Sequence, residues 1–264
     1  MSTVSITNNS LPELVRPLFS ENEVIPILRE QYDLHCTVKE LPGERDRNYL
    51  AQDNIGNLYV LKISNASECL DYLKIQIQAL EYTAKILGKR RIPSVIPDKN
   101  GDSLSITISP SNNSHWTRLV KFIDGVPMAN YKPHTIKFLH ELGFMCGTIT
   151  KALQNITMQP KKRRHLWEMH NAKENLQQYI QWIDGKKLRS LISHFLDLYN
   201  DSLTQVEKGL RRGWIHNDFN DYNVLVIPNI DENPSLGLID FGDMAHSYIA
   251  AEPAIACAYA MLNK

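Results

Sequence analysis

Two short apolar runs in the last quarter of the sequence constrain its fold more than any other feature. Val224–Ile227 and Leu236–Ile239 are apolar, short and bounded by prolines. Runs of this kind predict the two strands of a β-hairpin. In such a hairpin Asn223, which precedes the first strand, lies close to Asp240, which follows the second, although the two residues are far apart in sequence.

The polar residues around this hairpin have the chemistry of phosphoryl transfer. Asp218 lies five residues before Asn223, and its carboxylate can accept a proton from an attacking hydroxyl. Asn223 offers a neutral oxygen to Mg²⁺, and Asp240 offers a charged oxygen that can bridge the metal to nucleotide phosphates. We therefore expect Asp218 to be the catalytic base and Asn223 and Asp240 to be the metal ligands.

These residues resemble the signature of the aminoglycoside phosphotransferase and choline kinase superfamily, which has a protein-kinase-like fold. That signature is His-x-Asp, an Asn five residues beyond the Asp, and then a hydrophobic-Asp-aromatic-Gly turn. Within the superfamily the sequence is most similar to hydroxylysine kinases and to the phosphotransferase domains fused to class III aminotransferases. The segments that carry this closer resemblance are 44–49, 60–65, 218–223 and 240–244.

The composition is that of a globular protein. With 264 residues, of which 43% are hydrophobic, the chain can bury the core of one large or two small domains. Lys plus Arg equals Asp plus Glu at 29 each, so the charge balance predicts neither a nucleic-acid nor a membrane partner. No signal pattern or apolar run of about 18 residues is present, and the four cysteines form no Cys-x-x-Cys pair. We expect a cytoplasmic protein, and the sequence does not indicate its oligomeric state.

The period of the apolar residues changes from strand-like to helical along the chain. The expected strands before the hairpin are 35–40, 49–52, 58–63, 104–109 and 116–122. The expected helices are 23–31, 67–87, 133–153, 171–183, 188–210 (with Gly213 as its C-cap) and 253–262.

This pattern predicts an α+β fold of the bilobal, protein-kinase-like type, with a small β-rich lobe and a larger helical lobe. We expect a nucleotide-binding lobe at residues 1–122, a hinge at 123–127, and a helical lobe at 128–264 that contains the catalytic loop and the metal-binding hairpin. The sequence ends at Lys264, where related kinases carry further helices, so the helical lobe looks truncated.

The junction between the lobes is the expected place of the nucleotide base. In the resembling family the backbone amide and carbonyl of this segment hold the purine edge, which implies contacts from Val120 and Phe122. A plain interlobe linker fits the Gly-x-Pro sequence at 125–127 equally well. No side chain here distinguishes ATP from GTP as donor; hydroxylysine kinases use GTP, and the resemblance implies the same.

Lys62 lies on a strand of otherwise apolar residues, where a lysine costs desolvation unless it meets an anion. We expect it to hold the α- and β-phosphates of the nucleotide; the alternative is a lysine that protects an edge strand. Family kinases usually fix this lysine with a glutamate of the next helix, but Lys74 stands at that place. Gln76, Gln78 or Glu81 could substitute, and only Glu81 is charged.

The loop expected to cover the phosphates, residues 41–48, has a single glycine. Backbone N–H groups near a tight turn can still hold phosphate, and Arg45 or Arg47 could add positive charge. A solvated mixed-charge turn is the alternative for either arginine. This branch of the superfamily shows a similar Glu-Arg-Asp loop.

Three further sites in the sequence have two interpretations each. His216 could assist the base, but a structural role in holding backbone near the metal-binding turn fits better. Asp221 could contact a substrate amine or loop backbone. Trp167 and Trp182 could wall a pocket for a zwitterionic amino-alcohol, or they could pack between helices.

The resemblance implies a small-molecule kinase that uses Mg²⁺ and transfers the γ-phosphoryl group of ATP or GTP to an alcohol. The expected acceptor is hydroxylysine or a related amino-alcohol, with aminoglycoside-type or choline-type acceptors as alternatives. A different class of function also stays open. The chain could be a non-catalytic nucleotide-binding or interaction module that keeps the fold.

Overall fold

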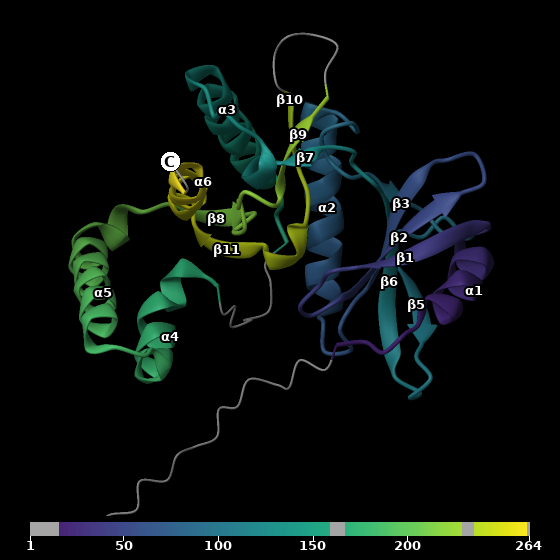
Figure 1. The fold of residues 1–264 in the computed structure, drawn as a ribbon, viewed down its shortest axis with the longest axis horizontal. Helices are drawn as coiled ribbons and strands as arrows, with labels where there is room; N and C mark the ends of the chain where they lie inside the picture. The colour runs from purple at the N-terminus through teal and green to yellow at the C-terminus, as the bar shows by residue number, and fades with distance from the viewer. Residues whose placement is uncertain (1–15, 159–166, 229–234, 263–264) are drawn as a thin grey trace, which may run out of the picture. The chain divides into compact units, whose positions relative to one another are not determined.

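A computed structural model describes residues 16–158, 167–228 and 235–262 (Figure 1). The chain divides into two compact units. The N-terminal unit contains the described residues up to Leu73 together with Ser94–Phe122. The C-terminal unit contains Lys74–Pro93 and the described residues from Ile123 onward.

The N-terminal unit is built on a six-stranded antiparallel sheet. The strand order is β1-β2-β3-β6-β4, and β5 pairs with β6. The bounds are β1 (Cys36–Leu41), β2 (Arg47–Asp53), β3 (Leu58–Ile63), β4 (Val95–Ile96), β5 (Ser105–Ile108) and β6 (Ser114–Lys121).

Helix α1 (Glu21–Tyr32) packs beside this sheet (Figure 1). Its fully buried Val24 and Leu28 belong to the same apolar cluster as Tyr49 and Leu61 of the sheet. The Tyr49 hydroxyl, which is also buried, donates a 2.6 Å hydrogen bond to the carbonyl oxygen of Phe19. The apolar core of this unit therefore lies between α1 and one face of the sheet.

Helix α2 (Leu70–Leu87) starts in the N-terminal unit, but most of it and the segment after it group with the C-terminal unit. The contacts of Arg91 explain this grouping. Arg91 Nε donates to the Leu236 carbonyl oxygen at 2.5 Å, and Arg91 Nη2 lies 2.7 Å from Glu141 Oε1. The amide of Leu238 in turn donates to the Arg91 carbonyl oxygen at 3.0 Å. Residues 74–93 therefore group with the C-terminal unit, and the predicted lobe boundaries (1–122, 123–127 and 128–264) stay predictions.

The C-terminal unit combines helices with two small antiparallel sheets. Its helices from residue 123 on are α3 (Ile136–Leu153), α4 (Ala172–Tyr179), α5 (Lys186–Val206) and α6 (Ala251–Met261). One sheet has the order β10-β9-β7, and the other pairs β11 with β8. These strands are β7 (Val126–Pro127), β8 (Arg212–Ile215), β9 (Val224–Ile227), β10 (Ser235–Leu238) and β11 (Ala245–Tyr248), and the 3-10 turn η5 (Phe241–Asp243) lies between the last two.

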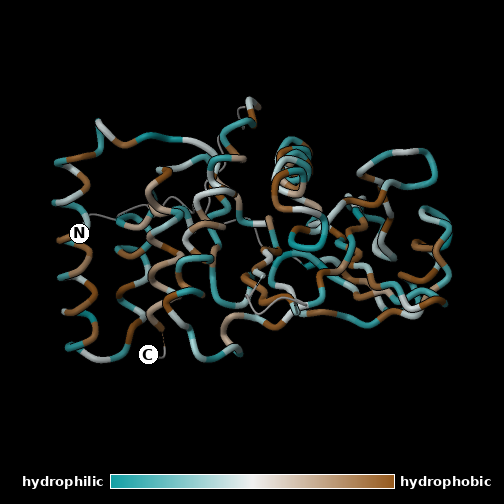
Figure 2. The backbone as a smooth tube through the Cα atoms, turned by 90° about the horizontal axis from the view of Figure 1, so that it is seen from above, coloured by the Kyte–Doolittle hydropathy of each residue, from teal (hydrophilic) through white to brown (hydrophobic). Residues whose placement is uncertain are grey.

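Helix α3 shows how apolar periodicity determines burial in this unit. Its five residues at three- and four-residue spacing, which the sequence places on one face, are all buried: Phe138, Leu142, Met145, Ile149 and Leu153. This face packs toward α6 and β8, and Thr135 caps the helix by accepting a hydrogen bond from the Phe138 amide at 3.2 Å. Figure 2 shows the alternation of hydrophobic and hydrophilic residues along the helices.

Several predicted elements differ from the observed ones. The predicted C-cap at Gly213 is wrong, because α5 ends at Val206 and Gly213 lies inside strand β8. The predicted helix at 171–183 is divided into α4 and two 3-10 turns, η2 (Met169–Asn171) and η3 (Ile180–Trp182). Within the described ranges, none of the helices has both the length and the apolar character needed to cross a membrane.

Gly237 in β10 allows a close approach between two backbone segments, and this gives a test of the fold. A Cβ atom at this position would lie 2.7 Å from the Arg91 carbonyl oxygen and 2.9 Å from Ile227 Cδ1. The carbonyl cannot retreat without breaking its bond to the Leu238 amide. We expect Gly237→Ala to lower the free energy of unfolding by about 1–3 kcal/mol, measured by urea denaturation.

The matched control is Gly147→Ala in α3, because no atom outside the helix lies within 4 Å of a Cβ built there. This change should raise the free energy of unfolding by about 0.5–1 kcal/mol, since alanine is the better helix former. Equal stability of Gly237→Ala and the unchanged protein would contradict this account of β10.

Candidate active site

The catalytic turn, defined here as residues 216–223, connects β8 to β9. Asn217 has a φ of 65°, in the left-handed region that asparagine tolerates better than most residues. Asn217 is buried, as is His216. The turn is therefore held in a specific conformation immediately before Asp218.

Two asparagine side chains donate hydrogen bonds to Asp218. Asn223 Nδ2 donates to Asp218 Oδ2 at 2.6 Å and to the Asp218 carbonyl oxygen at 3.0 Å. Asn220 Nδ2 donates to the other carboxylate oxygen, Oδ1, at 2.8 Å. Both oxygens of the predicted base are thus oriented by amide groups.

Asn220 is the centre of this network, and it is absent from the predicted site. Its Oδ1 accepts hydrogen bonds from the amides of Tyr222 at 2.9 Å and Asn223 at 2.8 Å. This is the local turn that asparagine side chains form with backbone two or three residues ahead. In the sequence, the signal for this turn is the asparagine between Asp218 and Asn223.

The environment of Asp218 makes its carboxylate a stronger base. Partial burial raises the pKa of Asp218 above its usual range, and the negative charges of Asp243 and Asp240 raise it further. The hydrogen bonds from Asn220 and Asn223 act in the opposite direction but do not cancel the increase. A raised pKa favours proton acceptance from an alcohol.

His216 has the structural role that its position in the sequence indicates. The amide of Asp218 donates to His216 Nδ1 at 3.3 Å, so this nitrogen is the acceptor. His216 Nε2 lies 3.1 Å from the Ile239 carbonyl oxygen, which can only accept, so Nε2 carries the hydrogen. A neutral imidazole therefore joins the catalytic turn to the segment that carries Asp240.

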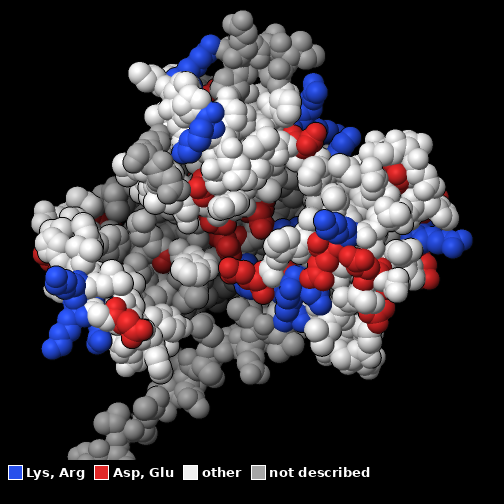
Figure 3. All heavy atoms as spheres, viewed as in Figure 1, with Lys and Arg blue, Asp and Glu red and all other residues white. Residues whose placement is uncertain are grey.

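The predicted hairpin brings Asn223 and Asp240 together. Val224 pairs with Leu238 in the antiparallel ladder, and the Ile239 amide donates to the Asn223 carbonyl oxygen at 3.0 Å. Asp240 has a φ of 56°, and its Oδ1 accepts a hydrogen bond from the Gly242 amide at 3.2 Å. Figure 3 shows acidic side chains gathered over the region where Figure 1 draws β11.

The donor set of these two residues fits Mg²⁺. Asn223 Nδ2 is directed at Asp218, so Asn223 Oδ1 points away from it and accepts no hydrogen bond from any described residue. Together with the Asp240 carboxylate it supplies oxygen ligands, and Mg²⁺ commonly takes one or two such ligands and fills its remaining positions with water and phosphate oxygens.

In the N-terminal unit, Lys62 is half-buried on β3. It pairs with Asn48 of β2 on one side and with Arg118 of β6 on the other. Directly opposite residues of antiparallel strands share a face of the sheet. Lys62 therefore shares its face with a second cation, Arg118, that the sequence analysis does not single out.

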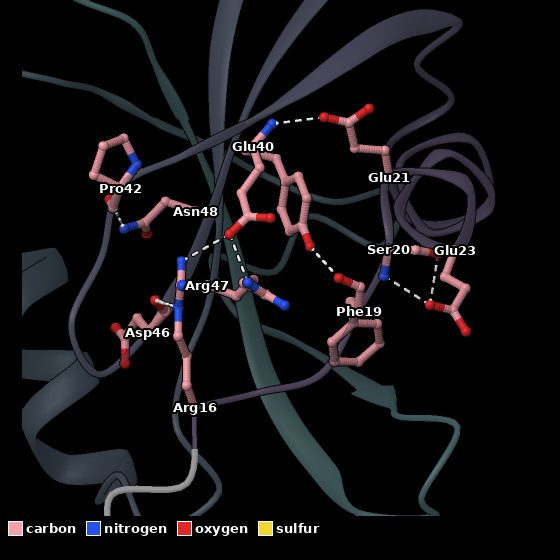
Figure 4. Close-up of polar contacts among 11 residues, drawn as sticks. Arg16, Phe19, Ser20, Glu21, Glu23, Glu40, Pro42, Asp46, Arg47 and Asn48 are labelled. Carbon is pink, nitrogen blue, oxygen red and sulfur yellow. Dashed lines mark hydrogen bonds and ion pairs between the residues drawn. The ribbon is translucent and has the colours of Figure 1, made fainter.

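Arg45 lies in the loop between β1 and β2, and its role toward phosphate stays a prediction. Its neighbour Arg47 is engaged within the unit, because Arg47 Nη1 lies 2.5 Å from Glu40 Oε1, the oxygen that Arg16 Nη2 also approaches at 2.9 Å (Figure 4). Asn48 Nδ2 donates across the loop to the Pro42 carbonyl oxygen at 3.3 Å (Figure 4). Arg47 thus joins the start of β2 to Glu40 of β1.

Val120 is buried in β6, and the Phe122 amide donates to the Leu58 carbonyl oxygen at 3.1 Å. The Phe122 amide is therefore used by the sheet, and the predicted purine contacts of both residues stay predictions.

Glu81 is exposed on α2 and makes no hydrogen bond or ion pair with any described residue, so its pairing with Lys62 also stays a prediction. Gln76 is buried, and its Nε2 lies 3.5 Å from the Gly242 carbonyl oxygen beside Asp240.

Trp167 and Trp182 are surface residues, with exposed fractions of 65% and 78%. The alternative that they pack in a core between helices is therefore wrong. The Trp167 carbonyl oxygen lies 3.5 Å from Asn217 Nδ2, which brings the Trp167 backbone close to the catalytic turn.

The sequence is similar to two hydroxylysine kinases. The sequence is 25% identical to a hydroxylysine kinase of Danio rerio over 94% of this chain and 72% of that protein. It is 23% identical to a hydroxylysine kinase of Mus musculus over 94% of this chain and 71% of that protein.

Three solved structures show the same fold. A microcompartment-associated aminopropanol kinase has a TM-score of 0.68 at 17% identity, over 88% of this chain and 73% of that one. An amicoumacin kinase in complex with AMP-PNP and Ca²⁺ has a TM-score of 0.65 at 15% identity, over 91% and 69%. An aminoglycoside 2'-phosphotransferase in complex with GDP has a TM-score of 0.63 at 17% identity, over 91% and 78%.

These likenesses confirm the predicted α+β, protein-kinase-like fold. A family model described as the phosphotransferase enzyme family matches residues 37–263, which include the β-rich sheet, the catalytic turn and the β9–β10 hairpin. The chain belongs to this phosphotransferase enzyme family.

Proposed function

We propose that the protein is a kinase that transfers the γ-phosphoryl group of a nucleotide to the hydroxyl of an amino-alcohol, either hydroxylysine or a close relative of it. The observation that carries this proposal is the Asp218 carboxylate, held on both oxygens by Asn220 and Asn223 beside the metal-binding hairpin. The similarity to two hydroxylysine kinases supports the acceptor class.

In the proposed reaction Asp218 orients the acceptor hydroxyl and takes its proton as the oxygen attacks the γ-phosphorus atom. Asn223 and Asp240 would hold Mg²⁺, which neutralises charge on the phosphates. Lys62 would bind the α- and β-phosphates through its ammonium group. The transfer is direct, and no covalent enzyme intermediate is needed.

The acceptor is proposed to be a cation because of the acidic residues near Asp218. Asp221 is only 9% exposed, and no hydrogen bond or ion pair engages its carboxylate among the described residues. A buried carboxylate is costly unless it meets a cation. Burial raises the pKa of Tyr259 on α6, and the charges of Asp218 and Asp221 add to this increase, so this tyrosine is near both acids. We therefore assign Asp221 to the substrate ammonium group.

The donor is proposed to be GTP or ATP, with GTP favoured by the similarity to hydroxylysine kinases. The solved relatives bind nucleotides of both kinds, as AMP-PNP in one and GDP in another.

The main test replaces the proposed base. Asp218→Ala should lower kcat for hydroxylysine-dependent release of nucleoside diphosphate by about 100-fold or more, because general base catalysis contributes about 10²–10⁴-fold. The nucleotide should still raise the melting temperature of the variant, since its binding groups are unchanged. The assay is run with GTP and with ATP.

Asp197→Ala on α5 is the matched control, because Asp197 is exposed and removed from the catalytic turn in sequence. It should keep full activity. Retained turnover in Asp218→Ala would show that another group is the base. Nucleotide binding without turnover of any alcohol by the unchanged protein would favour the non-catalytic module.

A second test addresses the ammonium site. Asp221→Asn should raise KM for the amino-alcohol by about 10-fold or more, because a charge-assisted hydrogen bond contributes about 1.5–3 kcal/mol. KM for the nucleotide should not change. Steady-state kinetics with each substrate varied in turn makes the comparison, and an equal rise of both KM values would contradict the assignment of Asp221 to the acceptor.

A further inference from the structure

Helix α5 exposes a stripe of large apolar side chains. The four members of this stripe recur at three- and four-residue spacing, which places them along one side of the helix: Leu188, Leu191, Phe195 and Leu198. Each is between 48% and 60% exposed, although α5 packs against α4 and η3 (Figure 1). The side chain that α5 buries, Leu196, follows Phe195 by one residue and therefore lies about 100° around the helix from it. A second apolar side left in water indicates a surface for another helix.

The charges of α5 are arranged against its own dipole. Three basic residues lie near its N-terminus, Lys186, Lys187 and Arg189, and the first turn contains no acid. Asp197 and Asp201 lie in the second half, and the last turn contains no basic residue. The dipole of a helix favours acids at the N-terminus and bases at the C-terminus. This charge pattern therefore lowers the stability of α5 as long as the helix has no partner.

A second copy of α5, running antiparallel to the first, covers the stripe and offsets the charges. The spacing of the stripe is that of positions a and d in a heptad, the positions that meet in a two-helix coil. When Phe195 stands opposite Leu191 of the second copy, Leu188 stands opposite Leu198 of that copy. Every apolar residue of the stripe then meets another one, and the basic half of each helix faces the acidic half of the other.

The same register pairs two specific charges. Lys187 and Asp201 are fourteen residues apart, so they occupy the same heptad position, g, on one flank of the stripe. In an antiparallel pair this flank faces itself, and the register set by Phe195 and Leu191 places Lys187 opposite Asp201 of the second copy. Both residues are exposed. A parallel pair would instead bring the basic ends of the two helices together, so the charges favour the antiparallel arrangement.

We propose that the protein forms a homodimer through antiparallel, two-fold pairing of α5. A two-fold interface requires one surface that is complementary to itself, and the stripe together with the Lys187–Asp201 flank meets this requirement. The occupant of the surface is thus a second copy of this chain. The proposal concerns assembly and does not depend on the proposed function.

The first test is the oligomeric state of the full chain, measured by sedimentation velocity over the micromolar range. The unchanged protein should associate to a dimer as its concentration rises. Phe195→Asp should raise the dissociation constant by about 100-fold or more, because it places two carboxylates inside an apolar interface where aromatic residues contribute most. Phe195 is exposed in the single chain, so the variant should fold, and circular dichroism checks this.

The second test exchanges the two charges of the flank. Lys187→Asp and Asp201→Lys should each raise the dissociation constant by about 10-fold, because both attractive pairs of the dimer become repulsive. The double variant restores opposite charges and should recover the affinity of the unchanged protein. Lys187→Asp also brings an acid to the N-terminus of α5, which favours the helix itself. A weaker dimer in this variant therefore cannot result from a less stable helix.

Lys186→Asp is the matched control, because it makes the same charge change one residue earlier, on the side of α5 away from the stripe. It should leave the dissociation constant unchanged. A chain that stays monomeric over the whole concentration range would overturn the proposal. So would a dimer that Phe195→Asp does not weaken, since its interface would lie elsewhere. Failure of the double variant to recover affinity would overturn the antiparallel register.

Discussion

The antiparallel pairing of β9 with β10 is the constraint on which the proposed site depends. Because the Ile239 amide bonds the Asn223 carbonyl oxygen, the ladder continues one step beyond the two strands and ends with Asn223 beside Asp240. His216 then joins this end to the catalytic turn through the Ile239 carbonyl oxygen. Backbone hydrogen bonds therefore determine where the proposed metal ligands and the proposed base lie.

The electrostatics of the same region follow from this geometry. Pairing the strands brings Asp240 and Asp243 close enough to Asp218 to raise its pKa, and the buried Glu252 of α6 adds a further acid beneath the turn. Such a concentration of acids would repel itself in an empty site. It becomes favourable when a divalent metal and a substrate ammonium group are bound, which is the charge pattern of the proposed reaction. The acidity of the site therefore supports a cationic acceptor as well as a bound metal.

The sequence predicts those parts of the structure that depend on local pattern. The β9–β10 hairpin and the buried face of α3 could be predicted because apolar spacing alone determines them. Glu252 could not be predicted, because its contact with residues 216 and 217 joins positions far apart in sequence. The grouping of residues 74–93 with the C-terminal unit depends in the same way on Arg91 contacts with Leu236 and Glu141. Long-range polar contacts of this kind leave no periodic trace in a sequence.

Backbone strain gathers where these long-range contacts act. Four non-glycine residues among those described have a positive φ. Two of them are Asn217, which precedes the proposed base Asp218, and Asp240, which is a proposed metal ligand. Each lies beside a carboxylate that accepts a backbone hydrogen bond. Glu252 accepts one from the Asn217 amide, and the Asp240 side chain accepts one from the Gly242 amide. Left-handed conformations cost about 1–3 kcal/mol each when unsupported. Their persistence here indicates that α6 and the η5 turn stabilise a geometry that the local sequence would not adopt alone, and that geometry is the one in which Asp218, Asn223 and Asp240 converge.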